Sequence, residues 1–262
     1  MRVGLITDDP GHPLLAATAA LLAPAHGVQV VDPAAPLGAA RDPADVYLLK
    51  SHTPAALALA RDLEGRGAPV VNSAAATALC QDRAAMAELA VRAGLPFAAT
   101  RSVDALGAWA AGASLDSPVV VKSRHNRRAD LVARAEDTAG LRALARDWPD
   151  EPVVVQPFTA NSGWDHKLWA IGDRVFAALR RSELSPEGRG PTLPLAELPP
   201  GWAELTLRVG EVFALDVYGV DVLATADGAP LIVDVNAFPG IRDQAGAPEA
   251  LARLALERGR PG

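Results

Sequence analysis

Residues 218–237 constrain the fold more than any other part of this sequence. Two mostly apolar runs, YGVDVLAT and PLIVDVNA, flank an Asp-Gly turn, which is typical of an antiparallel β-hairpin. On a strand, residues two apart face the same side, so Asp234 and Asn236 project together while the valines beside them face the core. An unpaired charge inside such an apolar strand is costly, and Asp234 therefore indicates a polar site.

Asp221 lies on the partner strand of this hairpin and can face the same site. Two carboxylates and an amide oxygen form a hard oxygen set that suits Mg²⁺ (or Mn²⁺), whose shell is usually completed by water and phosphate oxygens. We therefore predict a metal site at Asp221, Asp234 and Asn236, with the polar edge of a surface hairpin as the alternative. Arg242 follows the hairpin after a Phe-Pro-Gly turn and is a candidate substrate-binding residue.

The first 75 or so residues alternate between short apolar runs and Leu/Ala-rich helical segments. Strands are expected at 3–7, 28–32, 45–50 and 69–73, and helices at 12–25 and 53–66. This β-α alternation predicts a small parallel sheet with flanking helices.

The rest of the chain is organised differently, because two of its strand pairs are joined by tight turns. Helices are expected at 82–93, 138–148, 203–215 and 248–258, strands at 117–123 and 152–158, a hairpin around Gly172-Asp173, and a Pro/Gly-rich loop at 185–201. The fold class predicted is α/β with antiparallel hairpins in its second half.

Lysine is rare in this chain. Of the 25 Lys and Arg residues only three are lysines, Lys50, Lys122 and Lys167, and a retained lysine in an arginine-rich chain suggests that a compact ammonium is needed. Lys122 ends a run of three valines, so its ammonium can point into a cleft and neutralise phosphate oxygens, or it can lie at the surface. Lys50 is left without a role.

Two further segments carry candidate contacts. Gln156, Pro157 and Phe158 close the strand 152–158, and the proline interrupts the ladder as a hinge would. Backbone groups there could meet an adenine edge while Phe158 packs on the ring, although Phe158 taken alone is better explained as a core residue. In the 164–181 hairpin, Lys167 and Arg181 are candidates for contact with a γ-phosphate or an anionic substrate.

The segment that follows Lys122 is the densest basic run of the sequence. Arg124, His125, Arg127 and Arg128 lie within it, and their position favours a small anionic partner, a carboxylate or a phosphate. An exposed loop with solvated charges is the alternative.

Composition excludes several classes of function. The formal net charge is −6, which gives no general reason to bind nucleic acid. The single cysteine, Cys80, cannot form an internal disulfide. The N-terminus turns acidic too early for a signal peptide. The apolar runs are too short for a membrane span. No Walker A or GxGxxG pattern occurs. We expect a cytoplasmic protein with neither membrane nor nucleic acid as partner, and the sequence leaves a homo-oligomer open.

Five segments, taken in order, resemble the ATP-grasp enzymes and within them the RimK-like ligases. They are NSAAATALCQDRAAMAELAVRAGLPFAAT, PVVVKS, VVVQPF, DHKLWAIGDRVFAALRRS and the pair YGVDVL with LIVDVNAFPG. The last two segments also resemble those of the inositol 1,3,4-trisphosphate 5/6-kinases.

The resemblance implies an α+β ATP-grasp fold. It would have a parallel N-terminal βαβ domain at 1–76, a small lobe at 77–158 and a C-terminal lobe with the metal site at 159–262, with ATP clamped between antiparallel sheets. It also implies that Lys122, Lys167, Arg83 and the segment 156–158 bind ATP, and that Lys167 and Arg181 act on the transferred phosphoryl group. Arg124, His125, Arg128 and Arg242 would bind an anionic substrate.

The implied activity is phosphoryl transfer from ATP with Mg²⁺. A RimK-like ligase would join a carboxylate to an amine through an acyl phosphate, whereas a kinase would stop after the transfer, and a nucleotide-binding sensor would not turn over. The loop 123–133 contains no glycine, whereas these families usually have a glycine-containing lid there.

Overall fold

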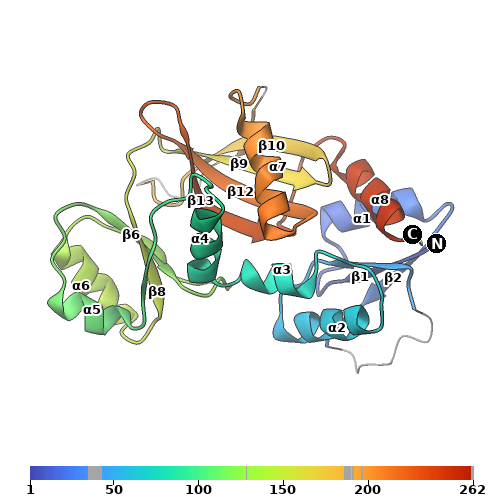
Figure 1. Cartoon of the computed structure of the whole chain (residues 1–262), viewed down its shortest axis with the longest axis horizontal. Helices are drawn as coiled ribbons and strands as arrows, with labels where there is room; N and C mark the ends of the chain where they lie inside the picture. The colour runs from blue at the N-terminus through green and yellow to red at the C-terminus, as the bar shows by residue number, and fades with distance from the viewer. Residues whose placement is uncertain (35–42, 128, 186–189, 191, 196, 261–262) are drawn as a thin grey trace.

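The computed structural model describes residues 1–34, 43–127, 129–185, 190, 192–195 and 197–260. Three sheets lie along the long axis of the molecule, as Figure 1 shows. The parallel sheet lies at one end, a five-stranded antiparallel sheet in the middle, and a four-stranded antiparallel sheet at the other end. This arrangement confirms the predicted fold class.

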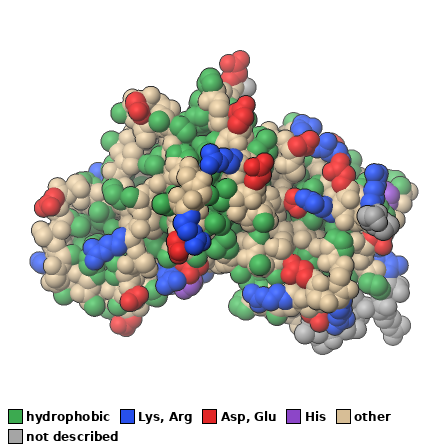
Figure 2. All heavy atoms as spheres, viewed as in Figure 1, with side chains coloured by type: hydrophobic (Ala, Val, Ile, Leu, Met, Phe, Trp, Pro, Cys, Tyr) green, Lys and Arg blue, Asp and Glu red, His purple; other side chains and the backbone are tan. Residues whose placement is uncertain are grey.

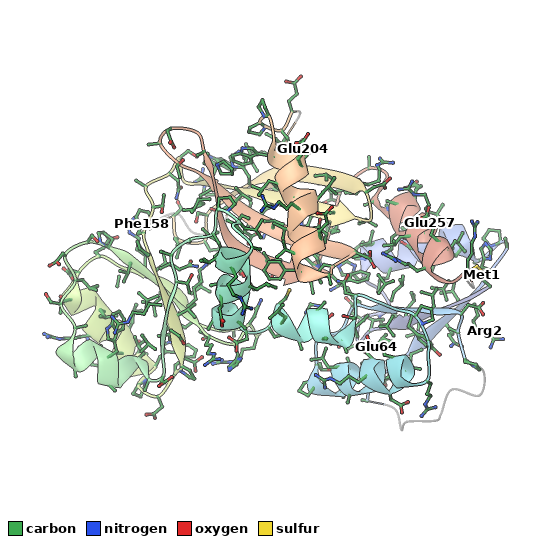
Figure 3. The ribbon with its side chains drawn as sticks, in the orientation of Figure 1. Met1, Arg2, Glu64, Phe158, Glu204 and Glu257 are labelled. Atoms are coloured by element: carbon green, nitrogen blue, oxygen red, sulfur yellow. The ribbon has the colours of Figure 1, made fainter. Side chains whose placement is uncertain are left out.

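The N-terminal sheet has the strand order β2-β1-β3-β4 and is parallel throughout. Its strands are β1 (Arg2–Ile6), β2 (Gly27–Val31), β3 (Val46–Leu49) and β4 (Val70–Val71), and its helices are α1 (Pro13–Leu22), α2 (Pro54–Gly65) and α3 (Ala74–Leu79). Thr53 caps α2 by accepting a hydrogen bond from the amide of Ala56. Glu64 of α2 accepts one from the amide of Ala74, where α3 begins (Figure 3).

The central sheet has the order β11-β10-β9-β12-β13. Its strands are β9 (Trp164–Ile171), β10 (Arg174–Arg181), β11 (Thr192–Pro194), β12 (Val217–Ala224) and β13 (Pro230–Ala237). Both expected hairpins, β9–β10 and β12–β13, are present with antiparallel pairing. Helix α7 (Trp202–Phe213) lies across this sheet in Figure 1, and α8 (Ala247–Arg258) lies beside α1. Strand β11 lies within the segment that we expected to be a loop.

The third sheet, which we call the small lobe together with its helices, has the order β5-β8-β6-β7. It consists of β5 (Arg101–Val103), β6 (Val119–Ser123), β7 (Val132–Ala135) and β8 (Val153–Pro157), with α5 (Leu106–Gly112) and α6 (Thr138–Asp147) packed on it. Strand β7 begins within the 123–133 segment that we expected to be a lid loop. Helix α4 (Arg83–Arg92) lies between the small lobe and α7 in Figure 1.

The hydrophobic clusters join parts of the chain that are far apart in sequence. Val3 and Leu15 of the N-terminal sheet and its helix share one cluster with Ile171 of β9 and Leu251 of α8. Buried residues between 80 and 97, a segment that we expected to belong with the small lobe, pack instead with α7 and the central sheet. The small lobe has its own core, which begins at Val103.

Asn72 connects the N-terminal sheet to the central hairpin. Its side-chain oxygen accepts hydrogen bonds from the amides of Asp216 (2.8 Å) and Val217 (2.9 Å), and its Nδ2 donates to the Val217 carbonyl (2.6 Å). Asn72 is 1% exposed, so it supplies buried backbone groups at the start of β12 with partners.

Basic and acidic side chains are interspersed over the face drawn in Figure 2. Within the described ranges, no helix combines the length and the apolar character that a bilayer span needs.

Candidate active site

A cavity of about 380 Å³ lies where the small lobe, α4 and the central sheet meet. Phe158, labelled in Figure 3, marks the end of the cavity wall contributed by the small lobe. Nine of the residues predicted from the sequence line this cavity, and they come from all three parts: Arg83, Lys122, Gln156, Pro157, Phe158, Lys167, Asp221, Asp234 and Asn236.

The β12–β13 hairpin holds the three predicted metal ligands on one wall. Asp221 pairs directly with Asp234, and Gly219 with Asn236, so the two carboxylates face the same side of the sheet. The register then shifts, because Val222 pairs with Ile232 and leaves Val233 without a residue opposite it. This is a β-bulge, a feature common beside active sites.

The bulge gives Lys122 its position. The Lys122 ammonium donates a hydrogen bond to the carbonyl oxygen of Val233 (2.9 Å), which the irregular ladder leaves available. Lys122 is only 7% exposed, and burial lowers its pKa although the nearby Asp234 carboxylate opposes this shift. The strand β6 therefore delivers a lysine from the small lobe onto the β12–β13 hairpin.

Lys167 lies between two carboxylates on the central sheet. Its ammonium is 2.8 Å from Asp221 Oδ2 and 3.5 Å from Asp165 Oδ2. Burial opposes its charge, but Asp221 and Asp165 outweigh burial and raise the Lys167 pKa. Burial also raises the pKa of Asp165, against the effect of Lys167. The ammonium is therefore held charged at the cavity wall.

Arg83 connects α4, the loop after β6 and the β12–β13 hairpin. Its Nη1 donates to the Ser123 carbonyl (2.8 Å) and to Asp130 Oδ2 (2.6 Å), while Nη2 lies 3.7 Å from Asp234 Oδ2. The same loop is fixed by Arg124, whose guanidinium donates to the Asp82 carboxylate. Nonlocal pairs thus hold the glycine-free loop at the position where related families usually have a lid.

The segment 156–158 closes the opposite wall. Gln156 is 5% exposed and donates to Thr100 Oγ1 (3.0 Å), and the Phe158 amide donates to the Pro118 carbonyl. The Phe158 ring lines the cavity and lies 3.6 Å from the Arg134 guanidinium. The alternative that Phe158 is a core residue is therefore wrong.

The donor set suits a magnesium ion that shares its shell with phosphate. Burial raises the pKa of Asp234 in spite of Lys122 and Arg83, so this carboxylate would gain from a closer cation. Across the described residues, no group of three or more His, Cys, Asp and Glu is placed to hold a metal. The amide oxygen of Asn236 and ligand oxygens would have to complete the set formed by the two carboxylates.

Several predicted residues lie elsewhere. The structure places Arg181 outside the cavity wall, over the Trp164 ring at 5.5 Å. Arg124 pairs with Asp82, and His125 is exposed beside it, so neither lines the cavity. Arg242 is exposed near Gly240, beyond the cavity wall. Arg128 lies outside the described residues.

Among the lining residues that were missed or given no role are Asn126, Asp130, Asp165 and Arg180. Arg180 could have been found, because counting back from the Gly172-Asp173 turn pairs Lys167 with Ala178, and Arg180 shares the face of Ala178. Asn126 donates from Nδ2 to Asn236 Oδ1 (3.3 Å). Such a contact between residues 110 positions apart leaves no local signal in the sequence.

Comparison with known proteins agrees with this architecture. Residues 88–247 match the family model described as the RimK-like ATP-grasp domain, which is more than half of the chain. The chain belongs to the RimK-like ATP-grasp family. The predicted resemblance is thereby confirmed at the level of the family, while the local similarity to the inositol-phosphate kinases gains no support.

Relatives of this family member are named as ligases. A protein of Rhodopirellula baltica named "Probable alpha-L-glutamate ligase" is 33% identical over 133 residues, which cover 48% of this chain and 33% of the relative. A Hahella chejuensis protein named "Probable alpha-L-glutamate ligase 2" is 27% identical over 196 residues, 71% of this chain and 64% of the relative. The matched parts therefore span from about a third to just under two thirds of these relatives.

Solved structures match over nearly the whole chain. A RimK domain ATP-grasp protein from Sphaerobacter thermophilus has a TM-score of 0.77 at 24% identity, covering 98% of this chain and 100% of that one. A D-alanine–D-alanine ligase from Bacillus anthracis has a TM-score of 0.73 at 15% identity, with 99% and 97% covered. At such identities these matches establish the ATP-grasp fold.

Proposed function

We propose that this chain is an ATP-dependent ligase that joins a carboxylate to an amine. The observation that carries the proposal is the convergence on one cavity of two buried lysines, Lys122 and Lys167, with the facing carboxylates of Asp221 and Asp234. Positive groups of this kind neutralise a triphosphate. Membership of the RimK-like family supports the same reading.

Within this proposal, the nucleotide spans the cavity from the small lobe to the central sheet. Adenine would lie against the segment 156–158, with the Phe158 ring packed on it. The phosphates would extend toward Lys122, Lys167 and Arg83, whose positive groups all face the cavity. Arg180, on the same strand face as Lys167, replaces Arg181 as the arginine proposed to contact the transferred group.

Asp221, Asp234 and Asn236 would hold a magnesium ion. When bound, the ion would neutralise charge on phosphate oxygens and orient them. The protein side chains have a complementary task, because Lys167 already lies against Asp221 and Arg83 near Asp234. These cations would turn toward the phosphates on binding.

The proposed reaction has two transfers and no protein nucleophile. A carboxylate oxygen of the acceptor forms a bond to the terminal phosphorus of ATP, and the bond from that phosphorus to ADP breaks, which gives an acyl phosphate. The amine nitrogen of the second substrate then bonds to the acyl carbon, inorganic phosphate leaves, and the nitrogen loses a proton. Lys122, Lys167 and Arg180 would stabilise the charge that develops on phosphate oxygens.

The substrates are small anionic molecules in this proposal. Because the relatives are named as glutamate ligases, L-glutamate is the first amine to test, together with a panel of amino acids and dicarboxylic acids as acceptors. The lining of the cavity is rich in charged side chains, which agrees with charged ligands.

The test combines phosphate release with product mass. Purified protein with Mg²⁺, ATP and the panel should release phosphate and yield a product with the summed mass of both substrates less one water. A substrate heavier by one phosphoryl group, without phosphate release, would indicate a kinase, and ATP binding without turnover would indicate a sensor.

A matched pair of variants tests the metal assignment. Asp234→Asn should abolish turnover with the fold retained, because it removes a charge from the proposed ligand set. Asp227→Asn makes the same change in the exposed turn of the same hairpin and should leave turnover unchanged. Wild-type turnover in Asp234→Asn would remove the proposed metal role of this residue.

A further inference from the structure

A second polar site lies at the carboxyl ends of β1 and β3. In the strand order β2-β1-β3-β4, the chain runs from β1 to β2 at one edge of the sheet and from β3 to β4 at the other edge. The point where the connections diverge is the topological switch point, and ligands of open α/β sheets bind in the crevice outside the strand ends there. His12 follows β1, and Lys50 and His52 follow β3.

The histidines of this crevice lack partners. His12 is 6% exposed, and neither of its ring nitrogens has a hydrogen bond in the structure as described. His52 is held on one side by a hydrogen bond with the backbone of Ala237, and its buried Nε2 is also without a partner. Buried polar atoms are nearly always hydrogen-bonded, so three orphaned nitrogens at one strand edge point to a ligand.

The charges of the crevice favour an anion. Lys50 is partly buried, its ammonium lies 5.9 Å from the Phe238 ring centroid, and no described residue forms an ion pair with it. Arg242 is the second cation that faces this group, and Asp8 and Asp9 are the acidic side chains that face it. Both aspartates and Arg242 are exposed, so solvent screens all three more than it screens Lys50, whose ammonium is the least screened charge of this group.

The crevice adjoins the main cavity. The segment 238–242 follows Asn236, and its residues Pro239 and Gly240 line the cavity. The other side of this segment faces the crevice, because a Cβ added to Gly240 would lie 3.4 Å from His12 Nε2. Gly240 thus lies between the proposed phosphate site and His12.

We propose that the crevice formed by His12, Lys50, His52 and Arg242 binds a carboxylate of the acceptor substrate, one that the acceptor carries in addition to its reacting carboxylate. The cations would neutralise it and the imidazoles would hydrogen-bond to it. The acceptor is then a dicarboxylic acid that reaches past the segment 238–242 into the main cavity. This inference rests on the proposed ligase function and assigns its substrate class.

Histidine NMR tests the crevice without turnover. L-glutamate, succinate and inorganic phosphate are titrated into the protein at constant ionic strength, and the imidazole signals are assigned with His12→Gln and His52→Gln. The His12 and His52 signals should shift with succinate or L-glutamate. Those of His26, His125 and His166, which lie elsewhere, should remain in place and serve as internal controls.

Lys50→Met should weaken the binding of the acid about tenfold or more, because one charge-assisted contact is lost. Arg92→Met removes a charge from an exposed position on α4 and should have no effect. An acid affinity in Lys50→Met equal to that of wild type would overturn the inference, as would the absence of any shift in a protein that binds an ATP analogue. Phosphate binding as tight as that of the acids would overturn the assignment to a carboxylate.

The binding of the acid to the crevice and the ligase activity can be tested independently of each other. Acid-dependent shifts that Lys50→Met weakens, in a protein that never forms a condensed product from ATP, would support the crevice and refute the ligase. Condensation by a wild type whose crevice histidines do not respond to either acid would support the ligase and refute the crevice.

Discussion

Asn72→Ala should destabilise the protein by an amount that the structure allows us to calculate. The substitution removes the acceptor of the buried Val217 amide and of the partly buried Asp216 amide. A buried donor left without a partner costs about 1–3 kcal/mol, and a hydrogen bond that water partly replaces about 0.5–1.5 kcal/mol. The Val217 carbonyl keeps the Phe238 amide as its donor at 2.8 Å, so it adds little. Asn72→Ala should therefore lower the free energy of unfolding by about 2–4 kcal/mol in total.

Thermal and urea unfolding measure this loss, which corresponds to a melting temperature lower by about 5–15 °C. Asn161→Ala is the matched control, because Asn161 makes a similar pair of hydrogen bonds with Thr159 and Gly163 inside its own partly exposed loop. The control should lose less than about 1 kcal/mol. Equal losses in the two variants would refute the claim that Asn72 holds the N-terminal sheet to the central hairpin.

Asn72→Asp adds a pH dependence with a defined sign. The carboxylate would keep both amide donors, but it would place a charged oxygen where Nδ2 now lies, 2.6 Å from the Val217 carbonyl. Burial and this contact should raise the pKa of the introduced carboxyl above its unfolded value of about 3.9. Stability relative to wild type should therefore be greatest below pH ~4 and fall as pH rises through the folded pKa. A pH-independent difference would contradict this reasoning.

Three further predictions concern single side chains. Burial raises the pKa of Cys80 to about 12, so the native thiol should react with a thiol reagent at pH 8 far more slowly than the unfolded chain; equal rates would show that the thiol is accessible. Burial lowers the pKa of His52 to about 4, so the unfolded chain binds more protons between pH 6.5 and 4. In urea titrations the free energy of unfolding should therefore decrease as the pH is lowered from 6.5 to 4. His52→Gln should flatten this dependence, and an unchanged slope would assign it to other groups. Asp130→Asn weakens the contact with Arg83 at 2.6 Å and should lower stability by about 1 kcal/mol while speeding tryptic cleavage after Arg127; unchanged cleavage would mean that other contacts hold the loop.

Short-range patterns explain why much of the fold could be predicted. The Gly172-Asp173 and Asp227-Gly228 turns, with alternating apolar residues on both sides, fix the two hairpins. The alternation places Asp234 and Asn236 on one face of their strand, but regular pairing from the turn would put Asp221 opposite Val233, and only the bulge brings it opposite Asp234.

Contacts between distant segments explain what could not be predicted. The bulge at Val233, which positions Lys122, has no residue signature in its strand. The loop after β6 has the basic composition of an exposed ligand-binding segment, yet Arg124 is engaged by Asp82 of α4. The partnerless nitrogens of His12 and His52 depend on how the segment 238–242 packs over the parallel sheet.

Helix α8 has a consequence for the order in which the protein acquires its structure during synthesis. Leu251 and Leu254 of α8 pack in one cluster with Leu15 of α1 and Val46 of β3, although some 200 residues separate them. The apolar side chains of the N-terminal sheet thus gain this part of their covering only after residues 247–258 have been synthesised. Until then the sheet stays partly uncovered, and chaperones could bind its apolar face.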